Sequence, residues 1–167
     1  MSTLSSANAD SGFASEITSQ YVIFTLDGQR YALALDTVER IVRAVEVTPL
    51  PEAPAVVLGV INVEGRVLPV LNLRQRFLLP HRDINLDDQF MIAYTGSRDV
   101  VLVIDETVGV IERDPSQIIA PNLVAAGLKH INGIVQLDDG LVLIHDLEKF
   151  LTQDEERTLT EAIGRAR

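Results

Sequence analysis

Four pairs of short apolar segments, each pair joined by a turn, constrain the fold of this chain more than any other feature. The first pair is the clearest, because Tyr21 to Leu26 and Arg30 to Leu35 flank Asp27-Gly28, a dipeptide that readily adopts the positive φ angles of a tight hairpin turn. The other expected hairpins span 60–71, 90–104 and 131–144. Hydrophobic residues make up 47% of the 167 residues, which is enough to bury a core. We therefore predict a mainly β fold.

The order of the hairpins indicates an internal repeat. Tyr21 to Asp36 resembles Phe90 to Asp105, because in both segments two apolar strands and a turn end in Asp. Gly65 to Leu73 is echoed, with one residue deleted, by Gly140 to Leu147. A repeat of about seventy residues has the size of a small five-stranded barrel with little core of its own. We therefore expect two such barrels side by side, with the crossover from one to the other near 80–88.

Helix signals are few and short, except at the C-terminus. Short helices are expected after Asn72 and after Asp146, and a longer one over 153–167. Thr152 and Glu155 have the spacing of a capping box, and the apolar residues that follow lie on one helical face. The first 17 residues contain no Lys, no Arg and no apolar run, which predicts a disordered tail and no secretory signal. Without an apolar segment of about 20 residues, the sequence predicts a cytoplasmic protein.

The sequence offers no catalytic motif. The formal net charge of −10 makes nucleic acid and anionic membranes improbable partners, and the absence of Cys excludes thiolate chemistry. His81, His130 and His145 lack metal-ligand spacing. The adjacent acidic pairs, at 87–88 and 138–139, fall in expected turns, where Asp is favoured for local hydrogen bonding. We predict that the chain is not an enzyme and uses no cofactor and no metal.

Several segments together resemble the CheW-like domain family. Gly59 to Leu73 is similar to the family signature G-x-x-N-x-R-G-x-x-x-P-x-x-D-L, and the segments 24–41 and 131–147 resemble the opening and the close of the family pattern. The resemblance covers about residues 18 to 152. It implies two SH3-like five-stranded β-barrel subdomains packed side by side, with short helices and a C-terminal helix, which agrees with the repeat.

The resemblance implies an adaptor function. CheW-like adaptors couple the cytoplasmic tips of chemoreceptors to the regulatory domain of a CheA-type histidine kinase, and they form rings with each other or with related domains. Such a protein would be cytoplasmic and recruited to the inner face of the membrane through its receptors. Two alternatives stay open: a β-barrel module that binds a small ligand or acts through an unrecognised site, and a regulatory decoy that binds the kinase but no receptor.

The resemblance also carries over a set of expected partner-binding positions. They are Val38, Arg40, Gly59, Asn62, Glu64, Arg66, Phe90, Ile111 and Gly133. The apolar members match contact positions of the family, although ordinary core positions carry the same residue types. Turn geometry would equally explain the glycines.

Glu64 is the main departure from the family, which usually has Arg at this position. Arg66 is expected on the same strand face, two residues on. Because a reversed charge at an interface discriminates against the usual partner, we hypothesise that the chain serves a paralogous chemosensory system. If Glu64 is instead only an exposed turn residue, its charge is free to vary.

Overall fold

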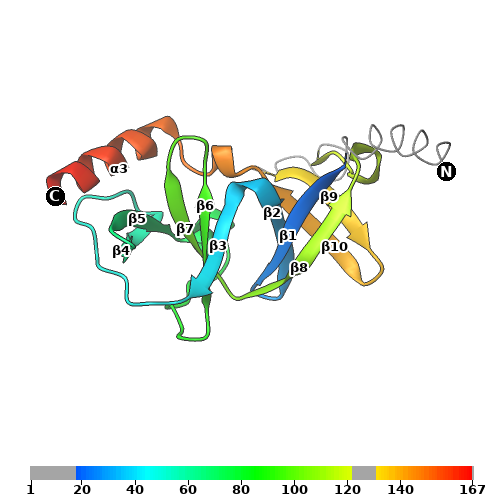
Figure 1. The fold of residues 1–167 in the computed structure, drawn as a ribbon, viewed down its shortest axis with the longest axis horizontal. Coiled ribbons are helices and arrows are strands. Elements are labelled where there is room, and N and C mark those ends of the chain that lie inside the picture. Colours follow the sequence, from blue (N-terminus) through cyan, green and yellow to red (C-terminus); the bar gives the residue numbers. More distant parts are fainter. Residues whose placement is uncertain (1–17, 122–130, 167) are drawn as a thin grey trace, which may run out of the picture.

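The computed structural model describes residues 18–121 and 131–166, and within these residues the strands form two five-stranded sheets (Figure 1). Sheet A has the order β8 (Glu106–Arg113), β1 (Ser19–Leu26), β2 (Gln29–Ala34), β10 (Gly140–His145) and β9 (Ile131–Leu137). Sheet B has the order β3 (Val38–Arg43), β6 (Gln89–Tyr94), β7 (Asp99–Ile104), β5 (Arg66–Leu71) and β4 (Val57–Val63). Each sheet is a barrel-like subdomain, which confirms the predicted fold class.

All four predicted hairpins are present as antiparallel pairs: β1–β2, β4–β5, β6–β7 and β9–β10. The turn of the first hairpin has the backbone that the sequence predicted, with φ of 54° at Asp27 and 81° at Gly28. In the second hairpin φ is 52° at Glu64 and 86° at Gly65. The local turn chemistry therefore fixes the register of these pairs.

The two repeats exchange strands between the sheets. Strands β1 to β5 form the first repeat and β6 to β10 the second, yet sheet A takes only β1 and β2 from the first repeat, and sheet B only β6 and β7 from the second. A parallel pair joins the repeats in each sheet, with Ala32 opposite Ile144 in sheet A and Val70 opposite Val101 in sheet B. If the five strands of each repeat are numbered from its own first strand, both sheets have the same order. Each sheet consists of the third strand of one repeat, the first and second strands of the other repeat, and then the fifth and fourth strands of the one. The duplication is therefore visible in the fold.

This exchange corrects the expected crossover near 80–88. That segment joins α2 (Leu73–Arg76) to β6 within the subdomain of sheet B. The chain instead passes between the sheets at the 3-10 helix η1 (Leu35–Thr37) and at Asp105. The physical reason is that the first hairpin of each repeat is apolar on both faces, so it is buried only when a layer covers each face.

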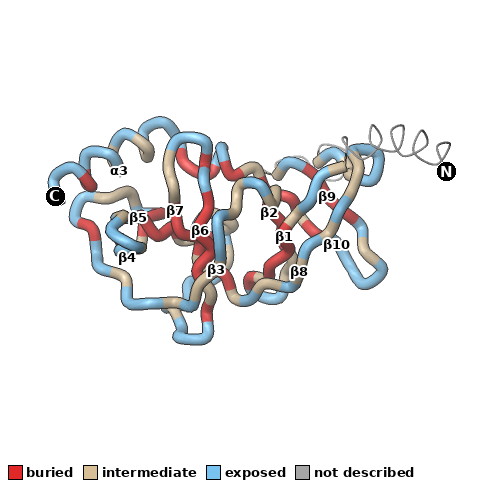
Figure 2. Tube along the Cα trace, in the orientation of Figure 1, coloured by how far each residue is buried: buried red, intermediate tan, exposed pale blue. Residues whose placement is uncertain are grey.

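The core has three clusters, and the central strands contribute to two of them (Figure 2). Val22 and Phe24 of β1 belong to a large cluster shared by both sheets, whereas Ile23 between them belongs to a small cluster of sheet A alone. In sheet B, Met91 belongs to the shared cluster and Ile92 to the small cluster of that sheet. The alternation of side chains along each strand thus joins two thin subdomains through one shared core.

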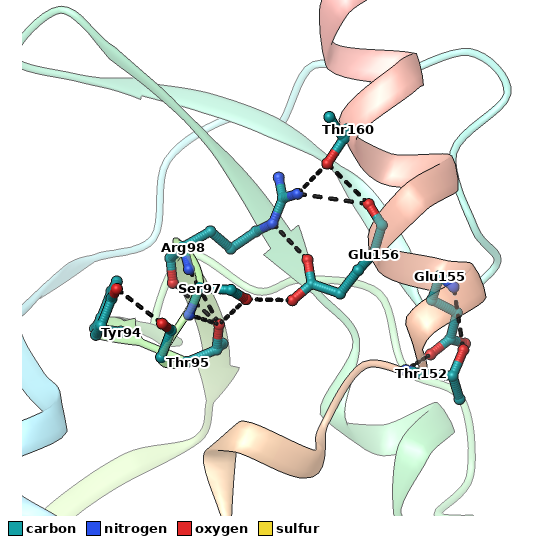
Figure 3. A network of polar contacts seen from close by, with 9 residues as sticks. Tyr94, Thr95, Ser97, Arg98, Thr152, Glu155, Glu156 and Thr160 are labelled. Atoms are coloured by element: carbon teal, nitrogen blue, oxygen red, sulfur yellow. Dashed lines mark hydrogen bonds and ion pairs between the residues drawn. The ribbon is translucent and has the colours of Figure 1, made fainter.

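Helix α3 (Gln153–Ala166) packs on this shared core through Leu159, Ala162 and Ile163, which are all buried. The capping box is present: Glu155 N–H donates to Thr152 Oγ1 at 3.1 Å, and Thr152 N–H donates to Glu155 Oε1 at 2.9 Å (Figure 3). The packed amphipathic helix and its cap are therefore confirmed as predicted.

Polar contacts tie the first turns of α3 to the subdomain of sheet B. Arg98, in the β6–β7 turn, donates from Nε to Glu156 Oε1 at 2.7 Å, and Ser97 Oγ donates to Glu156 Oε2 at 2.5 Å (Figure 3). Arg76 of α2 donates to Glu155 at 2.7 Å.

The remaining helices are short, namely η2 (Pro115–Gln117) and η4 (Leu147–Lys149) besides α2 and η1. Asn72 caps α2 and Asp146 caps η4 through their side-chain oxygens, so the two repeats end in equivalent ways. Within residues 18–121 and 131–166, none of the helices combines the length and the apolar character needed to cross a membrane.

Candidate partner-binding surface

Three of the expected site residues belong to one charged cluster on sheet B. Arg40 Nη2 lies 2.8 Å from Glu64 Oε1, while Arg66 lies 2.8 Å from both Glu39 Oε2 and Asp99 Oδ2. We call these five residues of β3, the β4–β5 turn, β5 and β7 the charged cluster. The hydrogen bond to Glu39 raises the pKa of Arg66 above its ordinary value. Positive and negative groups alternate across the cluster, and its net charge is negative.

The structure corrects the expected relation between Glu64 and Arg66. Glu64 is not on a strand face with Arg66, because Glu64 and Gly65 are the two turn residues and Arg66 opposes Val63 as the first residue of β5. Asn62 Oδ1 accepts a hydrogen bond from Gly65 N–H at 2.9 Å and closes the turn. The Glu64 side chain is therefore 72% exposed at the tip of the hairpin, where it contacts Arg40.

The structure places Phe90 inside the core, without exposed surface for the partner contact that was expected. Its side chain has no exposed surface and packs in the small core of sheet B with Val70 and Ile92. The run from Phe90 to Ala93 is apolar on both faces because sheet B is covered on both sides, so its alternation could not separate surface from core.

Val38 and Ile111 are half-buried. Val38 packs against the shared core and Ile111 against the small core of sheet A. Each lies on a strand at the end of its sheet, β3 for Val38 and β8 for Ile111. Both residues therefore keep part of their surface accessible while they support the core.

Sequence reasoning missed Val108 and Val110, which are 53% and 51% exposed on β8. Val110 opposes Val22, and Val38 opposes Ala93, so the valines of both end strands border the shared core. We call Val38, Ile41, Val108 and Val110 the apolar border. Exposed and half-buried residues alternate over 106–113 in the structure. The sequence signal for β8 was the spacing of Val108 and Val110, two residues apart, which places both valines on one face of a strand.

Gly59 and Gly133 are required by close packing. A Cβ atom on Gly59 would lie 2.2 Å from the carbonyl oxygen of Thr48, and one on Gly133 would lie 2.3 Å from Cγ2 of Ile118. Both glycines lie beside backbone bridges that continue the sheets, Thr48 with Val60 and Ile119 with Ile134. Their role in the structure is therefore to let these segments close over the strands.

The described residues contain no group of three or more His, Asp or Glu side chains that could hold a metal ion. His145 is buried and stacks on Phe77, with 4.0 Å between ring centroids, whereas His81 is exposed and contacts Asp83. His130 lies outside the described residues.

A pocket of about 320 Å³ lies at the outer end of sheet A. It is lined by Ser19, Tyr21, Arg113, Pro115, Ile118, Ala120 and Asn132. Among the lining residues that the structure describes, Arg113 supplies the one charged side chain, so these residues do not bring together the converging acids and bases of an active site.

Five charged residues join the subdomains at the point where the chain returns to sheet A. Asp105, between β7 and β8, accepts hydrogen bonds from Arg74 at 2.9 Å, from Arg82 at 2.8 Å and from the N–H of Asp27 at 2.9 Å. Arg74 is buried and also donates to Asp27, and Arg82 also donates to Asp88. Burial by itself raises the pKa of Asp105, but these hydrogen bonds outweigh it and hold the pKa below its ordinary value.

Comparison with known proteins identifies the family. The family model described as CheW-like domain matches residues 20–155. The chain is 30% identical over 144 residues to chemotaxis protein CheW of Thermotoga maritima, covering 84% of this chain and 90% of that protein. It is 28% identical over 142 residues to chemotaxis protein CheW of Treponema pallidum, covering 81% and 84%.

A solved structure agrees with these matches. The scaffolding protein TtCheW from Thermoanaerobacter tengcongensis superposes with a TM-score of 0.74 at 28% identity, covering 82% of this chain and 94% of that one. The match supports the two-sheet architecture over most of the chain. This chain therefore belongs to the CheW-like domain family of chemotaxis adaptors.

Proposed function

We propose that this chain is a non-catalytic adaptor that couples the cytoplasmic tips of chemoreceptors to the regulatory domain of a CheA-type histidine kinase. The family match and the names of the relatives, a chemotaxis protein and a scaffolding protein, support this function. In this function the adaptor works in the cytoplasm and reaches the membrane through the receptors.

The observation that carries the proposal is the presence of two chemically different exposed surfaces. The apolar border consists of valine and isoleucine beside the shared core, which suits the apolar face of a helical receptor hairpin. The charged cluster lies on sheet B and carries both signs of charge, which suits recognition of a folded partner by charge pattern. The two surfaces adjoin on β3, where Glu39 and Arg40 lie between Val38 and Ile41 in the sequence. An adaptor needs two such chemically distinct surfaces.

A binding experiment with each partner alone tests this assignment. Val110→Ser should weaken binding of a receptor-tip fragment and leave binding of the kinase regulatory domain unchanged, because Val110 lies in the apolar border. Val67→Ser, at an exposed valine of β5 outside that border, is the matched control. If Val110→Ser binds the receptor fragment as tightly as the unaltered chain, the apolar border is not the receptor surface. Binding of the kinase domain but of no receptor would instead indicate the regulatory decoy.

Glu64 gives the proposal its specific form, in which the chain serves a paralogous system with its own kinase. Arg40 forms an ion pair with Glu64 within the chain. A partner that binds here therefore contacts an arginine and a glutamate in fixed relative positions rather than a single carboxylate. A kinase surface that matches this pair should reject the reversed pair by like-charge contacts.

The test exchanges the two charges. The double variant Arg40→Glu with Glu64→Arg keeps the ion pair within the chain but should weaken binding of the cognate kinase regulatory domain about tenfold or more. The matched control exchanges Asp154 and Arg157, an exposed pair on α3. Equal binding of the unaltered chain and the Arg40–Glu64 exchange would place this pair outside the interface.

A further inference from the structure

Helix α2 ends in a backbone conformation that ordinarily requires glycine. The N–H of Leu78 donates to the carbonyl oxygen of Gln75 at 3.2 Å, and the N–H of Leu79 donates to that of Arg74 at 2.8 Å. These two bonds define a Schellman motif, in which the residue after the helix adopts a left-handed conformation. Here that residue is Leu78, with φ of 60°. A Cβ atom makes this conformation unfavourable, and glycine avoids the strain.

The other non-glycine residues in left-handed conformations differ from Leu78 in chemistry and in contacts. Among the described residues they are Asp27, Glu52 and Glu64. Each contacts an arginine: Asp27 with Arg74 at 3.2 Å, Glu52 with Arg165 at 2.9 Å and Glu64 with Arg40 at 2.8 Å. All three are therefore acidic residues whose side chains form an ion pair within the chain.

Leu78 is apolar and forms no ion pair. Its side chain is 91% exposed, whereas the neighbouring Phe77 and Leu79 pack against the shared core. Exposure of a single leucine is ordinary, but here the side chain gains no burial energy and the backbone would favour glycine, so neither the core nor the backbone explains a leucine at this position. We infer that Leu78 is a docking residue, which inserts into an apolar pocket on the kinase regulatory domain that the proposed function assigns as a partner.

The connection that runs from Leu78 to β6 carries charges that define this partner further. It holds the exposed carboxylates of Asp87 and of Asp83, which contacts His81, while the guanidinium of Arg82 is held by Asp88 and Asp105. A complementary pocket therefore has a basic rim. A second copy of this chain, with a net charge of −10, does not meet that requirement. A single protruding side chain also fits a closed pocket of a folded domain better than the extended face of a helical hairpin, which suits the apolar border instead.

The inference makes folding and binding respond in opposite directions. Leu78→Gly and Leu78→Asn both introduce residues that accept the left-handed conformation, so the urea midpoint of unfolding should stay unchanged or rise. Binding of the purified kinase regulatory domain, measured by calorimetry, should weaken about tenfold or more in both variants. Leu86→Gly is the matched control, because Leu86 is 82% exposed on the same connection and its backbone is not left-handed. This control should bind normally.

Three outcomes decide the matter. Normal kinase binding by Leu78→Gly, while the unaltered chain binds, would overturn the inference and leave the proposed function intact. An equal loss in Leu86→Gly would also overturn it, because general exposed apolar surface would then explain the effect. If the unaltered chain binds neither the kinase domain nor the receptor fragment, the proposed function fails and this inference fails with it.

Discussion

Replacing Asp105 by Asn should destabilise the protein by about 2–3 kcal/mol at neutral pH. The carboxylate accepts hydrogen bonds from Arg74 and Arg82, and a hydrogen bond to a charged group contributes roughly 1.5–3 kcal/mol. Leaving a buried charge without its partner can destabilise a protein by about 3–5 kcal/mol. The expected value is lower because the Asp105 side chain is 28% exposed and each arginine keeps a second carboxylate, Asp27 or Asp88.

The same substitution should lose its effect in acid. Because the folded-state pKa of Asp105 lies below its ordinary value, the ionised carboxylate stabilises the fold at pH values above its ordinary, unfolded-state pKa. This contribution is lost as the pH falls through the folded-state pKa. The difference in unfolding free energy between the unaltered chain and Asp105→Asn should therefore be constant from about pH 7 to 5 and shrink below about pH 4.

Urea unfolding at several pH values measures both effects. Asp139→Asn is the control, because Asp139 also pairs with an arginine, Arg30, but is 78% exposed and should contribute far less. The slope of free energy against urea should be the same for all three proteins. An Asp105→Asn effect no larger than that of Asp139→Asn, or one that persists undiminished at pH 3, would refute the argument.

Three further substitutions test the packing. Phe90→Ala should lower the unfolding free energy by about 3–5 kcal/mol, because the ring is fully buried; a near-neutral effect in urea unfolding would contradict its place in the core. Gly59→Ala should destabilise by about 1–3 kcal/mol through its clash with Thr48, whereas Gly109→Ala, which has open space, should have little effect on the melting temperature. Thr152→Ala removes the cap of α3 and should lower the free energy of unfolding in urea by about 1 kcal/mol. The helical circular-dichroism signal should also be lost at a lower temperature. An unchanged free energy and an unchanged melting temperature would show that the cap contributes nothing.

The sequence predicted what local chemistry controls. Asp27-Gly28 and Glu64-Gly65 have the turn residues that a two-residue hairpin needs, and the Thr152–Glu155 spacing specified a helix start. The equivalent caps Asn72 and Asp146 were visible as an Asn-Leu and Asp-Leu echo because a cap depends on only a few neighbouring residues. Glu64 was expected in the turn, but its side chain was still assigned to the same strand face as that of Arg66. That assignment was wrong, because a turn residue does not follow the alternation of the strand after it.

Long-range pairing set the limit of prediction. The exchange of hairpins depends on β2 pairing with β10 and β5 with β7, and alternation within a strand does not name its partner. The burial of Phe90 had the same origin, because a strand covered on both faces reads as a continuous apolar run. Arg40, Glu64 and Arg66 were expected as partner-binding positions, which stays a prediction. Their ion pairs with each other and with Glu39 and Asp99 became visible only when distant strands were brought together.

In the proposed function the chain stands between two other proteins, and for such a role the strand exchange has a mechanical consequence. A pull on sheet A relative to sheet B loads the peptide passages at η1 and Asp105, the connection from β10 to α3, and also the side chains of the shared core. Moreover, each sheet contains a parallel strand pair whose two members come from opposite halves of the chain. If the chain were cut anywhere in 80–88, each sheet would therefore consist of strands from both fragments. Neither half could keep its own sheet intact without the other, and displacement of one subdomain would be transmitted to its neighbour as a movement of a single body.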